Sequence, residues 1–254
     1  MIDLLIVTGG SKGIGKNIVL NASRSAKKVL AIGSSDLIHN VSDRKKNIFT
    51  IKRDISRIDK DFDELSDFLK QYNPSSIGLA LCASKIGNFG GIVDADFKDW
   101  ENLYRINVLG NLSILQNILK FSDLNTFIRV IFFGGGGAAY GYPDFSGYSL
   151  SKVAVVRAVE NLGIEFKKDY KNASIVALAP GAVNTDMLAI VESHGGEVKT
   201  RTSINEPTNF VLDFILDKIP SNKLNGCFVH VRDDHKKYFQ EELNEDHFKL
   251  RRID

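Results

Sequence analysis

Seven short apolar runs, separated by segments with helical periodicity, constrain the fold of this 254-residue chain more than any other feature. The runs are continuous rather than alternating, which is typical of strands covered on both faces. The predicted strands are Leu4–Thr8, Lys28–Gly33, Ile48–Arg53, Ile77–Cys82, Phe127–Phe133, Ser174–Ala179 and Cys227–Val231. Strands that alternate with helices predict an α/β fold with a parallel, doubly wound sheet and right-handed crossovers.

Two of the intervening segments place their apolar residues on one helical face. One stripe consists of Phe62, Leu65, Leu69 and Tyr72, and the other of Val155, Val159, Leu162 and Phe166. The sequence has no internal repeat, low-complexity tract or linker rich enough to divide it. We therefore expect a single domain over residues 1–254.

The segment Leu188–Pro207 lacks this regularity. A loop of that length in a compact domain is either functional or disordered. It follows the sixth predicted strand and precedes a helix expected near Phe210–Ile219, so we expect a substrate-binding lid over the carboxyl ends of the strands. Its charged residues suggest a small polar substrate: Glu192, Glu197, Lys199 and Arg201.

The composition argues against several classes of function. A formal net charge of +2 gives no electrostatic case for nucleic acid or for an anionic membrane. No stretch approaches the roughly 18 apolar residues of a membrane span. The two cysteines and five histidines show no metal-ligand spacing. We expect a cytoplasmic protein with a small-molecule partner, no bound metal and no nucleic-acid or membrane partner.

A glycine-rich loop follows the first predicted strand and opens a helix. Its glycines are Gly9, Gly13 and Gly15. Glycine permits a tight turn and lets backbone N–H groups approach a pyrophosphate at the helix N-terminus. This placement predicts a dinucleotide site, and the alternative is a flexible turn without a ligand.

The choice of cofactor depends on the residue about 20 positions beyond the glycines, where an acid would bind a free ribose 2′-hydroxyl. This chain has Gly33-Ser34-Ser35 there, and Lys12 offers a positive charge to a 2′-phosphate. Asp36 is the counter-argument, although it comes two or three positions late. The sequence therefore favours NADP(H), with NAD(H) as the alternative.

Tyr148 and Lys152 are four positions apart, so they share one face of a helix. A nearby ammonium stabilises the phenolate and lowers the pKa of a tyrosine. The pair therefore predicts a tyrosine acid/base that works near neutral pH.

Taken in order, these motifs resemble the pattern of the short-chain dehydrogenase/reductase family: TGxxxGxG, NNAG, a single Asn, Ser, YxxxK and PG. The resemblance covers nearly the whole chain. It implies a single-domain Rossmann fold with a mostly parallel seven-stranded sheet and helices on both faces. It also implies hydride transfer between a nicotinamide and a carbonyl or hydroxyl group, in a homodimer or homotetramer paired through the helices that bear Asn107 and Tyr148.

The resemblance also assigns roles to residues. Tyr148 would be the acid/base, Lys152 its partner on the ribose, and Asn107 would position a water linked to the lysine. The turn Pro180–Thr185 would close over the nicotinamide. The cofactor-binding residues implied are Gly9, Ser11, Lys12, Gly13, Ile14, Gly15, Ser34, Asp54, Ile55, Ala83, Tyr148, Lys152, Pro180, Gly181, Val183 and Thr185.

Two departures from that pattern matter. The segment expected to read NNAG is Leu81-Cys82-Ala83-Ser84, in which Ala83 can still pack along the ribose. The serine expected 12 to 14 residues before Tyr148 is replaced by Gly134–Gly136. Another hydroxyl could supply the donor, with Tyr142 preferred over Tyr140, Ser146 and Ser84. A glycine backbone N–H could donate instead, or the chain could be a nucleotide-binding sensor or scaffold with weak or no catalysis.

Overall fold

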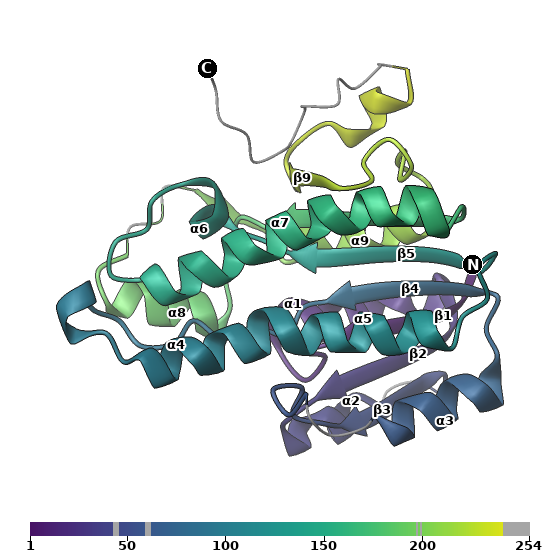
Figure 1. Cartoon of the computed structure of the whole chain (residues 1–254), viewed down its shortest axis with the longest axis horizontal. Helices are drawn as coiled ribbons and strands as arrows, with labels where there is room; N and C mark the ends of the chain where they lie inside the picture. Colours follow the sequence, from purple (N-terminus) through teal and green to yellow (C-terminus); the bar gives the residue numbers. More distant parts are fainter. Residues whose placement is uncertain (43–45, 59–61, 197, 199, 241–254) are drawn as a thin grey trace.

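The computed structural model describes residues 1–42, 46–58, 62–196, 198 and 200–240. Its centre is a seven-stranded sheet in the order β3-β2-β1-β4-β5-β6-β9, with every neighbouring pair parallel (Figure 1). The strands are β1 (Ile2–Thr8), β2 (Ala26–Gly33), β3 (Ile48–Lys52), β4 (Ser76–Leu81), β5 (Phe127–Phe133), β6 (Ala173–Ala179) and β9 (Cys227–His230). The predicted doubly wound α/β sheet is confirmed, and each predicted strand is present with its ends shifted by at most two residues.

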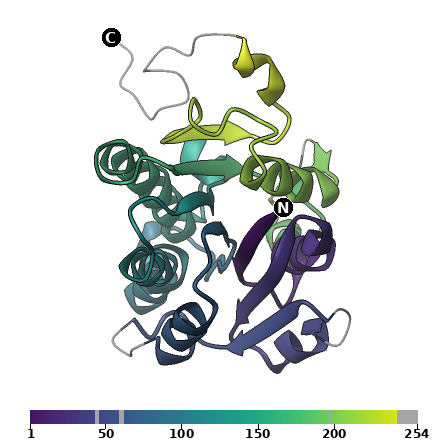
Figure 2. The same cartoon turned by 90° about the vertical axis from the view of Figure 1, so that its right-hand side faces the viewer.

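The helices cover both faces of the sheet, as Figure 2 shows with the helices seen end-on. On one face lie α1 (Gly13–Asn21) and α9 (Asn205–Ile215), and on the other α3 (Asp63–Tyr72), α5 (Asn111–Lys120) and α7 (Ser146–Asp169). Two apolar clusters fill these layers; Phe214 belongs to the first cluster, and Phe132 and Phe166 to the second. Both predicted helical stripes pack into the second cluster.

The direction of winding fixes where a ligand can bind. From β1 the chain winds outward to β2 and β3, and then crosses back to β4 on the other side of β1. Ligands of open parallel sheets bind beyond the carboxyl ends of the strands at such a switch point. Figure 1 shows α6 (Gly136–Ala139) and α8 (Asp186–Ser193) beyond the arrowheads of β4 and β5, beside this position.

The segment Leu188–Pro207 is not the continuous loop that the sequence predicts. Its first residues complete α8, residues 201–202 form the short strand β8 beside β7 (Ala182–Val183), and its last residues begin α9. The helix expected over Phe210–Ile219 starts at Asn205 and ends at Ile215. Pro207 lies in the first turn of α9, where a proline removes only an N–H that has no partner there, so the helix extends through it. Residues 197 and 199 lie outside the described part.

Within the described residues, no helix has the length and apolar character needed to cross a membrane.

Candidate active site

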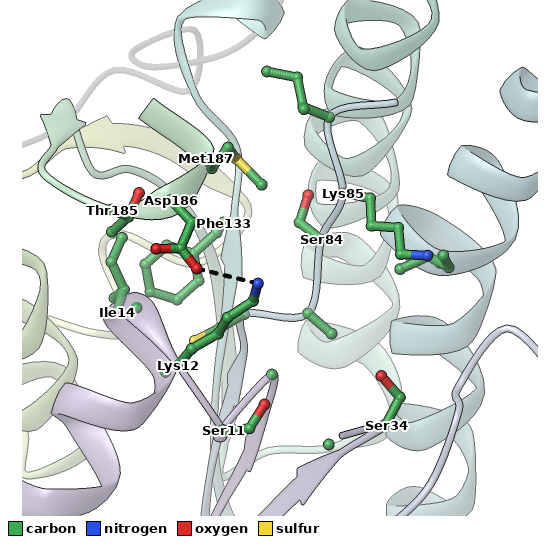
Figure 3. Close-up of a pocket in the computed structure, with 18 of the residues that line it drawn as sticks. Ser11, Lys12, Ile14, Ser34, Ser84, Lys85, Phe133, Thr185, Asp186 and Met187 are labelled. Carbon is green, nitrogen blue, oxygen red and sulfur yellow. Dashed lines mark hydrogen bonds and ion pairs between the residues drawn. The ribbon is translucent and has the colours of Figure 1, made fainter. Parts of the chain in front are cut away.

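A cleft of about 660 Å³ opens at the carboxyl ends of β1, β2, β4 and β5 (Figure 3). It joins the glycine loop, the loop after β4, the start of α7 and the start of α8. The predicted site residues that line it are Gly9, Ser11, Lys12, Gly13, Ile14, Gly15, Ser34, Asp54, Ile55, Ala83, Tyr148, Lys152, Pro180 and Thr185. Gly181, Val183 and Asn107 do not line it. The structure thus brings most of the predicted residues together around one cavity.

At one end of the cleft, the glycine loop packs directly against the residues that follow β4. Gly9 has φ +67°, and a Cβ at this position would lie 3.0 Å from the Ala83 Cα atom. Only glycine allows this close approach together with this backbone conformation. The result is a floor of backbone groups bordered by Ser11 and Ser84. The Ser84 Oγ atom is buried, and within the described residues it has no hydrogen-bond partner.

Lys12 reaches across the mouth of the cleft. Its Nζ atom lies 3.3 Å from Asp186 Oδ2 at the start of α8, as the dashed line in Figure 3 shows. Both side chains are mostly exposed, so water screens the pair and it contributes little to stability, about 0–1 kcal/mol. Lys12 is therefore paired with the start of α8 rather than with the end of β2.

A cationic side chain that the sequence reasoning missed lies beside the end of β2. Arg53 follows β3, borders the cleft with Ser34, and donates its backbone N–H to the Gly33 carbonyl at 2.8 Å. Its guanidinium lies 4.6 Å from the ring centroid of Phe62. The signal was available, because a residue just after β3 comes beside the end of β2 in a parallel sheet.

Asp36, the counter-argument to NADP(H), is engaged elsewhere. Its carboxylate forms an ion pair and hydrogen bond with Lys52, and this hydrogen bond lowers the pKa of Asp36. The carboxylate is exposed and lies beyond Ser34 and Ser35 in the sequence. It does not line the cleft.

Tyr148 and Lys152 lie in the first two turns of α7 and face the cleft. Lys152 is only 3% exposed and its Nζ donates to the Phe133 carbonyl at 2.8 Å. That nitrogen lies 5.4 Å from the centroid of the Tyr148 ring. The helical placement predicted from their spacing is confirmed.

The ionisation of the pair differs from the sequence expectation. Burial raises the pKa of Tyr148, with a smaller contribution from Tyr142, and burial lowers the pKa of Lys152 to about 8. Desolvation disfavours the charged form of each group. The expected lowering of the Tyr148 pKa is therefore wrong for the chain alone, in which the Lys152 amine is directed to a backbone carbonyl.

Asn107 lies behind the cleft, in a π-helical turn, η4 (Arg105–Gly110), between α4 (Phe97–Tyr104) and α5. It is 1% exposed. Its amide accepts from the Lys85 N–H at 2.8 Å and donates to the Lys85 carbonyl and to Ser151 Oγ, both at 2.9 Å. Ser151 Oγ in turn donates to the Tyr148 carbonyl at 2.7 Å. Asn107 thus links the loop after β4 to the helical turn that carries Tyr148.

The sequence reasoning also missed Asn111, the first residue of α5. This buried amide hydrogen-bonds to Thr8 at the end of β1 and to Ala83 after β4. Its position four residues after Asn107 was the available signal, because residues with that spacing lie on one helical face.

The glycine run has two distinct environments near Tyr148. The Gly134 N–H is already committed to the Leu178 carbonyl at 2.9 Å, and a Cβ at Gly134 would lie 2.7 Å from the Phe228 ring. A Cβ at Gly135 would lie 3.7 Å from the Tyr148 hydroxyl. Gly135 is thus the position from which a side chain would face the tyrosine.

The candidate replacement hydroxyls differ in their placement. Tyr140 is 79% exposed. Tyr142 stacks on Phe145, with ring centroids 4.6 Å apart, in an apolar cluster that also includes Tyr148. Burial raises the pKa of Tyr142, so its hydroxyl stays protonated and can donate.

The substrate end of the cleft is largely apolar around Tyr148, with Ile86, Phe133, Met187 and Ile190 among its lining residues. Of the lid charges used to predict a polar substrate, Arg201 pairs with Glu192 and also donates to Asn184. Glu197 and Lys199 lie outside the described residues. The charges that can be placed therefore satisfy each other.

No group of three or more histidine, cysteine, aspartate or glutamate side chains gathers to hold a metal ion in the described part of the chain.

Residues 3–195 match the family described as short chain dehydrogenase. The chain belongs to this family. It is 26% identical over 189 residues to a probable tetrahydroxynaphthalene reductase of Zymoseptoria tritici, a match that covers 72% of this chain and 68% of that protein. This membership makes the chain an oxidoreductase of the NAD(P)-dependent, carbonyl-reducing kind.

Solved structures of short-chain dehydrogenases share its fold. The 3-ketoacyl-(acyl-carrier-protein) reductase of Brucella melitensis, complexed with NADH, has a TM-score of 0.77 at 16% identity and covers 92% of this chain and 98% of its own. A putative short chain dehydrogenase of Escherichia coli CFT073, complexed with NADPH, has a TM-score of 0.73 at 16% identity. The match covers 91% of this chain and 97% of that one. These likenesses confirm the single-domain Rossmann architecture of the aligned chain.

Proposed function

We propose that this short-chain dehydrogenase is an NADP(H)-dependent carbonyl reductase or alcohol dehydrogenase in which Tyr148 is the catalytic acid/base. The observation that carries the proposal is the placement of Tyr148 and Lys152 on the wall of the cleft whose opposite end is the glycine loop. The backbone floor at Gly9 and the unpaired Ser84 hydroxyl fit a bound nucleotide, which when present supplies or accepts the hydride at its nicotinamide.

The chain's own residues would handle the proton and the orientation of the substrate. Tyr148 is protonated at neutral pH, so its hydroxyl can give a proton to the carbonyl oxygen as the carbonyl carbon gains the hydride. Lys152, protonated below about pH 8, would hold the ribose and supply positive charge near the tyrosine as the proton leaves. Asn107 would position the loop at Lys85 and the turn at Tyr148.

The preference for NADP(H) over NAD(H) has four supports. Ser34 replaces an acid at the end of β2, Arg53 borders that part of the cleft, and Asp36 is paired with Lys52. Lys12 is a fourth support, because its surface pair with Asp186 is weak enough to exchange for a phosphate. These residues favour a 2′-phosphate over a free 2′-hydroxyl.

Gly134–Gly136 stand where the family pattern has its serine, and we assign the donor role to Tyr142. Gly134 cannot supply its N–H without breaking its bond to Leu178, and Tyr140 is on the surface. Tyr142 belongs to the same cluster as Tyr148 and keeps its proton. The substrate would place its apolar part against residues such as Met187, with its oxygen toward Tyr148.

The assembly follows from the outer faces of the helices. Apolar side chains remain exposed on α4 and α7, including Phe97, Leu150 and Ile164 at 65%, 58% and 72%. Large apolar side chains that are this exposed are typical of an interface, and a homodimer or homotetramer paired through these helices would cover them. Sedimentation of a 28.2 kDa monomer at micromolar concentration would contradict this assignment. We place the protein in the cytoplasm.

The catalytic proposal is tested by the loss of NADPH absorbance against a panel of carbonyl compounds, with wild type and Tyr148→Phe compared on each. The proposal would be overturned if the wild-type protein consumed NADPH no faster than Tyr148→Phe with every compound tested. The glycine run at Gly134–Gly137 favours a second candidate, a nucleotide sensor or scaffold without turnover. Calorimetry separates the two: tight NADPH binding without catalysis supports the sensor, and no nucleotide binding excludes both.

A further inference from the structure

Asn111 forms a closed ring of hydrogen bonds beneath the cofactor end of the cleft. Thr8 Oγ1 donates to Asn111 Oδ1 at 2.7 Å, Asn111 Nδ2 donates to the Ala83 carbonyl at 2.9 Å, and the Ala83 N–H donates to Thr8 Oγ1 at 3.1 Å. Asn111 is 1% exposed. The ring satisfies both backbone groups of Ala83 and holds it against the first residue of the glycine motif.

The same amide extends toward the catalytic side. Asn111 Nδ2 lies 3.2 Å from the carbonyl oxygens of both Ile106 and Asn107. Both carbonyls belong to the π-helical turn η4, a geometry that is rare and concentrated at functional sites. All the partners of Asn111 Nδ2 are carbonyl oxygens, which can only accept, and the partner of Asn111 Oδ1 is a hydroxyl, which can donate. These partners therefore determine the orientation of the amide.

One chain of hydrogen bonds therefore joins the cofactor floor to the catalytic helix. It starts at Thr8, passes through Asn111 to the backbone of Asn107, continues from the Asn107 side chain to Ser151, and ends at the Tyr148 carbonyl. Its four side chains come from four elements: β1, α5, η4 and α7. A change in Asn111 would be transmitted to both ends.

The motif that normally follows the fourth strand would carry two amides, and here Leu81 and Cys82 stand in their place. Leu81 packs in the same cluster as Ile114 and Leu115 of α5, so this side of the strand end faces the helix that begins with Asn111. An amide is thus present in this region, but it is supplied by the helix instead of the strand.

We infer that Asn111 is a positioning residue of the dehydrogenase site, whose amide takes over from those missing at Leu81 and Cys82 and keeps Ala83 and Asn107 in register with the glycine loop. The inference rests on the proposed function for its kinetic consequences. The alternative is that Asn111 only satisfies buried polar groups and adds stability without affecting the site.

A matched control is available in Asn225. It is also buried, at 8% exposure, and also bridges two elements, accepting from the Ile175 N–H at 3.0 Å and donating to the Gly163 carbonyl at 2.7 Å. It does not line the cleft. Asn225→Ser should therefore lower the melting temperature to a similar degree as Asn111→Ser without changing the site.

The experiment compares Asn111→Ser with Asn225→Ser in melting temperature, NADPH dissociation constant, kcat and KM. We expect only Asn111→Ser to weaken NADPH binding and lower kcat, each by about tenfold, the scale of one lost hydrogen bond. Equal values of the dissociation constant and kcat in the two variants would overturn the inference.

A readout that needs no turnover keeps this result separate from the proposed function. In hydrogen–deuterium exchange, Asn111→Ser should speed exchange at the amides of Ala83 and Lys85, whereas Asn225→Ser should not. If wild type binds no nucleotide, the proposed function fails, and the exchange at these two amides still decides the inference.

Moving the amide from the helix back to the strand tests whether Asn111 replaces the strand amides. Asn111→Leu removes the amide from the helix, and adding Leu81→Asn returns one from the strand with total volume nearly kept. We expect the double variant to bind NADPH at least about threefold more tightly than Asn111→Leu alone, a change of roughly 0.7 kcal/mol. A folded double variant no better than the single variant would overturn the proposal that Asn111 replaces the strand amides.

Discussion

The two ends of the cleft are built from different parts of the chain. At the cofactor end, the contact of Gly9 with Ala83 exposes backbone groups, and this close approach depends on the absence of a side chain at Gly9. The substrate end presents side chains such as Tyr148 and Met187, which pack in one apolar cluster with Tyr142. Backbone recognition needs glycine at set positions, whereas side-chain recognition can be rebuilt with other residues.

This contrast explains where the family pattern holds in this chain and where it changes. The residues from Thr8 to Gly15 keep the pattern, since a Cβ at Gly9 would collide with Ala83. Near the substrate, our proposal is that Gly134–Gly136 stand in place of the serine of the pattern and that Tyr142, in the same cluster as Tyr148, supplies the hydroxyl. Each of the following changes tests one end while the other should stay intact.

The largest effect is expected at Tyr148. Tyr148→Phe removes the proton donor and should lower kcat by about 10²- to 10⁴-fold, the usual contribution of a general acid. The NADPH dissociation constant should change little, because the cofactor end does not depend on the hydroxyl. Steady-state kinetics with calorimetry checks both values, and a large loss of NADPH affinity would show that the two ends are not separable.

Tyr142→Phe should have the next largest effect. If its hydroxyl stabilises the substrate oxygen, kcat falls by roughly tenfold to a thousandfold with NADPH affinity unchanged. Tyr140→Phe is the matched control, since Tyr140 lies in the same loop but is 79% exposed. Unaltered turnover in Tyr142→Phe would leave Tyr142 a packing role only.

Gly135→Ser sharpens that result. In the Tyr142→Phe background it would place a hydroxyl near Tyr148, because the Cβ position lies 3.7 Å from the tyrosine oxygen. Its φ of +139° strains any side chain, so we expect only partial recovery, by about threefold. Gly134→Ser is the contrasting variant, and it should not recover activity, since its Cβ would meet the Phe228 ring at 2.7 Å.

The pH profile tests the charge on Lys152. Burial lowers its pKa from 10.5 to about 8, so the ammonium is retained below that value and lost above it. The value of kcat/KM for carbonyl reduction should therefore fall as pH rises through 8, by up to about tenfold per unit. A flat profile through this range would show that the ammonium is not required.

The lowered pKa of Lys152 also affects stability, and in the opposite direction: activity should fall as pH rises, whereas stability should increase. The unfolded state binds the proton more tightly than the folded state, so the contribution of Lys152 to folding should rise with pH between about 8 and 10.5. Denaturant unfolding of wild type and Lys152→Met at several pH values checks this difference.

The sheet and the glycine loop were predictable because each depends on local pattern. Continuous apolar runs such as Phe127–Phe133 indicate buried parallel strands, and the strand order then places Tyr148 near the glycine loop. The start of α9 was misplaced because the segment Leu188–Pro207 shows only weak helical periodicity in the sequence. Neither Arg53 nor Asn111 belongs to a motif, and both acquire their positions only through contacts between distant elements.

The pKa of Tyr148 was predicted in the wrong direction for a related reason. Spacing shows that Lys152 shares a face with the tyrosine, but it does not show that the Lys152 Nζ donates to Phe133 or that both side chains are desolvated. Burial is a property of the whole fold, and here it is the main cause that raises the pKa of Tyr148.

A cofactor-specific effect is expected from Arg53→Ala. If Arg53 contacts the 2′-phosphate, KM for NADPH should rise by about tenfold, the scale of one charge-assisted hydrogen bond partly screened by water. NADH serves as the internal control, because it lacks that phosphate and its KM should stay within about twofold. Arg53→Lys should fall between wild type and Arg53→Ala, since it keeps the charge without the planar fork. Equal changes for NADPH and NADH would mean that Arg53 supports the cleft through its packing on Phe62, and would remove it from the phosphate site.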